Sequence, residues 1–118
     1  MDTDKYGMII NGPETYSATA RLLRQAQPVV LNWGDQDGTM LNILLTYNPI
    51  RIGAPGGKID NGPHKLWVGV AGMGTYAFAV GDYIDPGYVG EKIGFRGVNP
   101  TTIALADLLS GIGKELAA

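Results

Sequence analysis

A single histidine and a nearby aspartate are the residues of this chain best suited to acid–base chemistry. His64 follows Pro63 directly, and Asp60 lies a few residues before it. A histidine on a loop at the start of a strand can act as a general base, and a carboxylate can orient its ring. A nucleophile is also needed, but Ser17 and Ser110 lie in predicted helices and no Gly-x-Ser-x-Gly motif exists. A small enzyme using His64 and Asp60 is one alternative, although a lone loop histidine is more often solvated, so we expect His64→Ala to be tolerated.

The segment 53–63 is the richest in glycine and proline, and we expect it to be a long loop. Its start resembles a phosphate-binding P-loop, but the spacing before Gly57-Lys58 is too short and Ile59 stands where Ser or Thr should hold magnesium. No helix is predicted to follow, so the dipole that binds anions is lacking. A second alternative is a module that binds a small ligand or partner through loop 53–64. Its candidate binding residues are Gly56, Gly57, Lys58, Asp60 and His64.

Metal and cofactor chemistry has little support in the sequence. Asp35 and Asp37 beside Gly38 resemble the start of a calcium loop, but Thr46 occupies the position of the bidentate acid. The chain has one histidine and no cysteine, which makes a zinc site or a disulfide framework improbable. We therefore expect no metal and no cofactor.

The composition favours contact between proteins. Charged residues make up only 17% of the 118 residues, the net charge is −2, and hydrophobic residues make up 45%. Charges are scattered singly, so no basic stripe is available for nucleic acid. The longest apolar stretch, 66–80, is interrupted by glycines and too short for a membrane span. The acidic start, with Asp2 and Asp4, does not resemble a signal peptide, so we expect an intracellular protein, or a virion protein if the source is a phage.

Helices are predicted near both ends of the chain. The first runs from Glu14 to about Ala26, after Pro13 and before Pro28. The second begins after Asn99 and Pro100 and carries an apolar stripe, in which Gly111 and Gly113 either weaken the helix or let it pack tightly. That stripe contains Leu105, Leu108, Leu109, Ile112 and Leu116.

Strands are predicted between the helices. Val29–Trp33 and Thr39–Tyr47 form one pair, and the second of these is apolar on both faces, which favours a central position. Lys65–Ala71 and Thr75–Val80 form the clearest hairpin, which we expect at the protected centre of the sheet. Further short strands are expected at 7–10 and 89–95, the latter after a turn at Asp85-Pro86-Gly87. The fold class is α+β: one domain, 1–118, with a largely antiparallel β-sheet and an N-terminal and a C-terminal helix packed on one face.

The second hairpin also suggests what the protein does. Its bulky residues alternate with small ones, so one face would let another backbone approach closely. Trp33 and Trp67 are expected in the core, and Tyr83 and Tyr88 on the surface. We expect a non-enzymatic structural or assembly protein that forms a homo-oligomer or contacts other subunits; by analogy alone, a virion decoration, tail or scaffold component is of this kind. The candidate interface residues are Ala77, Ala79, Tyr83 and Tyr88.

Overall fold

The structure is a computed structural model that describes residues 12–34, 38, 40–48, 51–54, 58–60, 65–93 and 97–118. Its elements, in chain order, are α1 (Pro13–Arg24), β1 (Val29–Gly34), β2 (Met40–Asn48), β3 (Arg51–Ala54), β4 (Lys58–Asp60), β5 (Lys65–Val70), β6 (Gly74–Ala79), α2 (Pro86–Ile93) and α3 (Pro100–Ala117). The strand expected at 7–10 lies outside the described residues.

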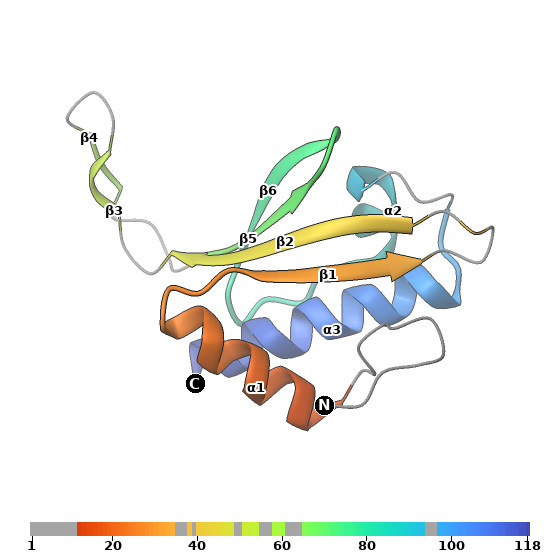
Figure 1. Cartoon of the computed structure of the whole chain (residues 1–118), viewed down its shortest axis with the longest axis horizontal. Helices are drawn as coiled ribbons and strands as arrows, with labels where there is room; N and C mark the ends of the chain where they lie inside the picture. Colours follow the sequence, from red (N-terminus) through yellow and green to blue (C-terminus); the bar gives the residue numbers. More distant parts are fainter. Residues whose placement is uncertain are drawn as a thin grey trace.

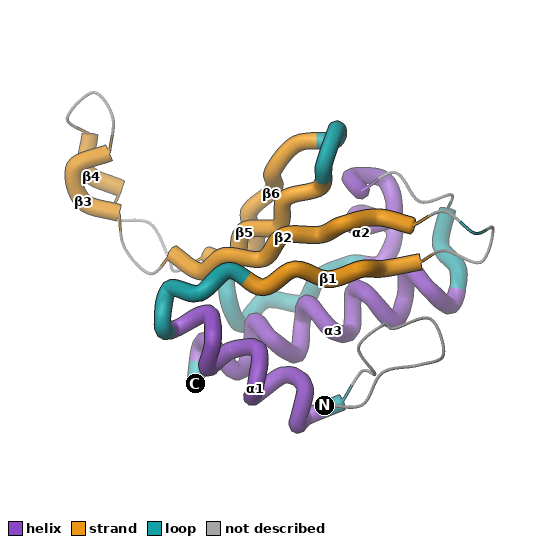
Figure 2. The backbone as a smooth tube through the Cα atoms, in the orientation of Figure 1, coloured by secondary structure: helices purple, strands orange, loops and turns teal. Residues whose placement is uncertain are grey.

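The fold is α+β, as the sequence predicts. Four antiparallel strands form one sheet in the order β1-β2-β5-β6, while β3 and β4 form a separate two-stranded sheet. The helices gather on one side of the four-stranded sheet, with α1 and α2 both packed on α3 (Figure 1). Figure 2 shows α1 and α3 as a layer below the strands β1 and β2. The central position of β2 is confirmed, because it pairs with both β1 and β5.

The helix α1 begins and ends where the sequence predicts, within two residues. Pro13 stands in its first turn, where the missing N–H costs nothing. At its other end Ala26 adopts a left-handed conformation with φ of 60°. The Ala26 N–H donates to Leu23 C=O and the Gln27 N–H donates to Leu22 C=O. This is the hydrogen-bond pattern of a Schellman cap, which satisfies the last carbonyls of the helix.

The C-terminal helix α3 contributes more buried residues to the hydrophobic core than any other single element. Asn99 caps it: the Asn99 side-chain oxygen accepts the Thr102 N–H at 2.9 Å. The predicted apolar stripe is buried, and it packs on the inward residues of the sheet, which include Leu31, Trp33, Ile43, Leu45, Leu66, Val68 and Val70. The indole N–H of Trp33 donates to Thr101 C=O at 3.2 Å, which ties β1 to the first turn of α3.

The strand predicted at 89–95 is wrong, because residues 86–93 form the helix α2. Asp85 is its N-cap: the backbone oxygen accepts the Val89 N–H at 3.0 Å, and the side chain accepts the Tyr88 N–H at 3.1 Å. Val89 and Ile93, four residues apart, are both buried. A Cβ at Gly90 would lie 2.9 Å from Gly97 C=O, so glycine permits close packing here. The turn signal at Asp85-Pro86 was therefore a helix start.

Two predictions about strands also need correction. The hairpin expected at the centre of the sheet is central only in β5, because β6 is an edge strand. The segment 53–63, expected to be a loop throughout, contains the end of β3 and all of β4. These strands pair with an irregular register, in which Arg51 is opposite Asp60 and Ala54 is opposite Lys58. Glycine and proline density thus did not exclude a short hairpin.

Candidate interaction surface

The sheet has a second face, turned away from the helices, which we call the outer face. Along each strand, successive residues point to opposite faces of the sheet. The buried residues therefore lie on the inner face, and the residues that alternate with them lie on the outer face. On β1 and β2 the outward residues include Val30, Met40 and Leu44, which are exposed hydrophobic residues. Val30 is 60% exposed and Leu44 44%. No described helix or strand covers them.

Register places one row of residues straight across the outer face. Val30 is opposite Leu44 on the neighbouring strand, Leu44 is opposite Gly69, and Gly69 is opposite Thr75. Two larger apolar side chains thus occupy the β1–β2 half of the row, and a glycine and a threonine occupy the β5–β6 half. In the next row the large side chain is on β5, where Trp67 is opposite Thr46 on one side and Ala77 on the other.

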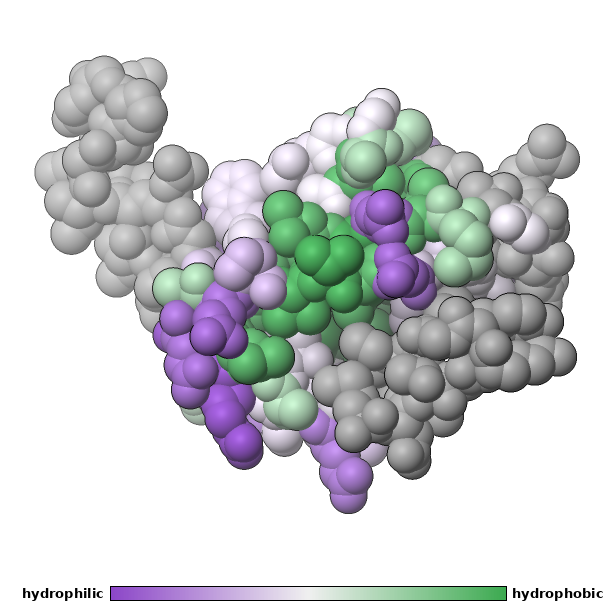
Figure 3. All heavy atoms as spheres, viewed as in Figure 1, coloured by the Kyte–Doolittle hydropathy of each residue, from purple (hydrophilic) through white to green (hydrophobic). Residues whose placement is uncertain are grey.

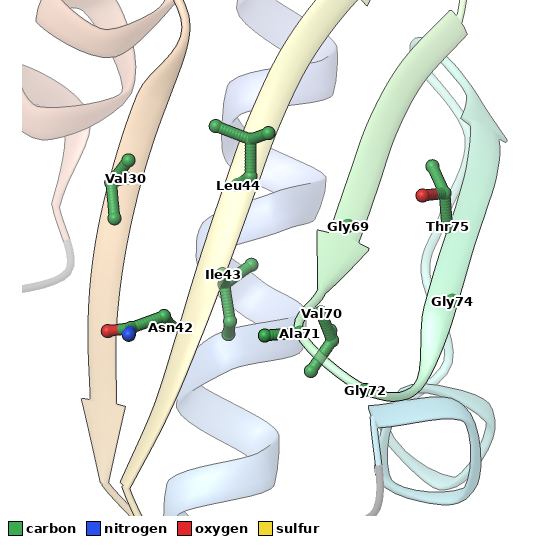
Figure 4. Close-up of a pocket in the computed structure, with 10 residues that line it drawn as sticks. All are labelled: Val30, Asn42, Ile43, Leu44, Gly69, Val70, Ala71, Gly72, Gly74 and Thr75. Atoms are coloured by element: carbon green, nitrogen blue, oxygen red, sulfur yellow. The ribbon is translucent and has the colours of Figure 1, made fainter.

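The small residues leave a shallow hollow in the outer face. Its volume is about 540 Å³. Figure 4 shows Leu44 on one side of Gly69 and Thr75 on the other, with the glycine turn that joins β5 to β6 at the end of the hollow. A Cβ at Gly69 would lie 3.5 Å from Thr75 Oγ1 and 3.8 Å from Leu44 Cβ, which are ordinary contacts. Position 69 is therefore open toward solvent.

The outer face is apolar in its middle and polar at its edge. Figure 3 shows a hydrophobic cluster in the centre of the visible surface, with hydrophilic groups beside it. Asn32 and Asn42 are exposed and opposite one another at one end, while Lys65 lies at the other end, in register with Ala79. An apolar centre with a polar rim is the usual anatomy of a protein–protein interface.

The four predicted interface residues lie on two different surfaces. Ala77 and Ala79 are half-buried on the outer face, as their register with Trp67 and Lys65 requires. Tyr88 belongs to α2 and packs edge-on against Phe78, with ring centroids 5.8 Å apart. Phe78 is opposite the buried Leu66, so this contact is on the helical side of β6. The surface position of both tyrosines is confirmed.

Tyr83 lines a separate hollow of about 430 Å³ on the helical side. The other residues that line it are Tyr16, Asp107, Ser110, Gly111, Lys114 and Glu115. Burial raises the pKa of Tyr16 above its ordinary value of 10, and the negative charge of Asp107 raises it further. The Ser110 hydroxyl accepts the Ile84 N–H at 3.1 Å, so this oxygen is used to hold the chain that follows β6. In this hollow, the Ser110 oxygen is therefore a structural hydrogen-bond acceptor.

Most of the predicted ligand-binding residues lie outside the part of the chain that the structure describes. Gly56, Gly57 and His64 lie outside the described residues. The backbones of Lys58 and Asp60 belong to β4, at its first and last positions. The ligand-binding and enzymatic alternatives therefore stay predictions. Within the part of the chain that the structure describes, no group of three or more histidine or acidic side chains could hold a metal ion.

Sequence reasoning missed the residues that dominate the outer face. The alternation along the predicted strand Thr39–Tyr47 places Met40 and Leu44 on one face, but the exposure of that face depends on where the helices pack. Trp67, expected in the core, is instead half-buried on the outer face. Its alternation with Leu66 and Val68, which are buried, was the signal that could have placed it there.

No helix within the described ranges is both long and apolar enough to cross a membrane. Comparisons of the chain with protein families, with curated proteins and with solved structures found no match.

Proposed function

We propose that this protein is a non-enzymatic structural or assembly protein that associates with copies of itself through the outer face of its sheet. The observation that carries the proposal is the exposure of Val30, Met40 and Leu44 on a sheet face over which no described element packs. A contiguous exposed apolar surface with a polar rim commonly marks a site of interaction with another molecule.

The scarcity of charged residues on the outer face supports a second copy of the chain as the partner. Lys65 is the only charged residue among the outward positions of the strands β1, β2, β5 and β6. A face without a field of one sign offers nothing to a nucleic acid or to a strongly charged partner. A largely apolar face with one charge, at its rim, can instead meet a second copy with little like-charge repulsion.

Two valines with almost the same exposure give a matched test. Val30 lies on the outer face and is 60% exposed, whereas Val98 precedes α3 and is 58% exposed. Val98 lies near α2, where its Cγ2 would be 3.7 Å from a Cβ at Gly87. Val30→Lys should therefore reduce the mass in solution to that of a folded single chain, while Val98→Lys leaves the mass of the unmodified protein unchanged.

Light scattering gives the mass, and circular dichroism checks that each variant is folded. If both lysine variants keep the oligomer of the parent, the outer face is not the interface and the proposal fails. A loss of the oligomer in both variants would point to a general effect of charge and would also count against the outer face.

A further inference from the structure

We infer that two copies stack their sheets face to face about a two-fold axis that runs along the strands, between β2 and β5. This inference rests on the proposed self-association and specifies its geometry. Such an axis exchanges the two halves of the sheet, so β2 faces β5 of the partner and β1 faces β6 of the partner. Residues of one row then face residues of the same row.

The row across the centre of the outer face is self-complementary under this operation. Leu44 falls on Gly69 of the second copy, and Val30 falls on Thr75 of the second copy, because these four residues are in register across the sheet. The hollow at Gly69 is thereby filled by a leucine from the other copy. The glycine has room to receive it, because no atom closes the space above position 69 more tightly than Thr75 Oγ1 at 3.5 Å.

The neighbouring row matches in the same way. Trp67 falls on Thr46 of the second copy, so a large side chain again meets a small one. A two-fold axis that crosses the strands along this row would instead place Leu44 on Leu44 and Gly69 on Gly69, which crowds one contact and leaves a void at the other. Interfaces pack as densely as protein interiors, so the first arrangement is favoured.

The size of the face limits the affinity. The sheet has four strands, spaced about 4.8 Å apart. Each strand has about seven residues, with a rise of about 3.3 Å per residue. The flat area of the outer face is therefore roughly 400 Å² per copy, before the relief of the side chains is added. Specific interfaces start at a total of about 1,000–1,200 Å². The two flat faces together give roughly 800 Å², which is below that range, so a dimer reaches the threshold only with the added side-chain relief and is expected to be weak. We expect a dimer that dissociates at concentrations on the order of micromolar.

Complementary substitutions test which residues meet. Leu44→Ala leaves two voids in the symmetric dimer, and Gly69→Leu places two leucines against two others, so each variant alone should dimerise at least about tenfold more weakly than the parent. Mixed in equal amounts, they should form a heterodimer with the affinity of the parent, because each contact again joins one large and one small residue. Native mass spectrometry distinguishes the three species.

Cross-linking then fixes the direction of the axis. The chain contains no cysteine, so Val30→Cys and Thr75→Cys introduce the only thiols. Facing positions in stacked sheets lie about 10 Å apart, whereas Val30 and its own copy would lie roughly 17 Å apart in this arrangement. A bis-maleimide linker of about 8 Å should join the two variants in a mixture and should not join Val30→Cys to itself.

The outcomes separate this inference from the proposed function. A dimer in which Val30→Cys is joined to itself, or in which mixing restores no affinity, overturns the geometry but leaves self-association standing. A protein that stays monomeric in the unmodified form overturns both. The axis along the strands is supported if Val30→Cys is joined to Thr75→Cys but not to itself, and if mixing Leu44→Ala with Gly69→Leu restores the affinity of the parent.

Discussion

The ring of Tyr16 in α1 lies directly on the backbone of Gly111 in α3, where an added Cβ would come within 2.4 Å of the ring. The two helices therefore meet at a position that accepts no side chain without movement of the tyrosine. The sequence leaves open whether the glycines of α3 weaken the helix or let it pack tightly. At Gly111 the contact with Tyr16 shows tight packing.

Gly111→Ala should destabilise the protein by about 1–3 kcal/mol, because the alanine methyl overpacks the contact with Tyr16. The matched control is Gly113→Ala, where an added Cβ would meet Gly81 N at 3.6 Å and Val80 Cα at 3.8 Å, both ordinary distances. That variant should gain about 0.5–1 kcal/mol from the higher helix propensity of alanine. Urea unfolding measures both, and equal effects at the two positions would contradict the close approach of α1 to α3.

Ala26→Gly should stabilise the protein by about 1 kcal/mol, because a left-handed conformation costs a residue with a Cβ and costs glycine nothing. Ala26 is exposed and has φ of 60°. Thermal unfolding of this variant should show a raised midpoint. Ala18, within α1, provides the control: Ala18→Gly should lower the stability by about 1 kcal/mol. A loss of stability at both positions would mean that the chain does not end α1 in this way.

The raised pKa of Tyr16 predicts a loss of stability in alkali. Because the fold favours the neutral phenol, the unfolded chain gives up this proton first as the pH rises through 10. The contribution of Tyr16 is present in full below pH 10 and is lost as the pH rises through the higher pKa of the folded state. The free energy of unfolding of Tyr16→Phe should therefore fall less steeply above pH 10 than that of the parent. Asp107→Asn should also reduce the slope, and an unchanged slope in both would contradict the assignment.

Hydrogen exchange should distinguish the two strands of the second hairpin. β5 is paired on both sides, whereas β6 pairs with β5 alone among the described strands. Amide protons of Leu66–Val70 should exchange more slowly, as a group, than those of Thr75–Ala79. The comparison is made in the dilute monomer, so that association adds no protection. Equal protection of both strands would mean that another segment or chain pairs with the edge of β6.

The elements with strong local signals could be predicted from the sequence. Pro13, Asn99 and Pro100 mark helix starts through their own backbone chemistry, and the alternation of Leu66, Val68 and Val70 identifies a strand whatever surrounds it. At Asp85-Pro86 the same residues serve as a turn or as a helix cap, and the choice depends on the burial of Val89 and Ile93 against α3. The residues near Asp85 do not by themselves predict that packing.

The candidate surface was harder to predict, since it depends on register. The row from Val30 to Thr75 joins four strands that are distant in the chain, and only their pairing brings Leu44 beside Gly69. Small residues on one face of the hairpin were visible in the sequence, and Ala77 and Ala79 do lie on the outer face. Which helices cover the other face, and hence which apolar residues stay exposed, follows from the tertiary fold.

The mass of the unmodified protein in solution, followed by light scattering across a dilution series, tests self-association most directly. One chain has a mass of 12.5 kDa. We expect a mass of two chains or more at high concentration, falling toward one chain on dilution to concentrations on the order of micromolar. A mass of one chain at every concentration, including the highest that can be reached, would contradict the account.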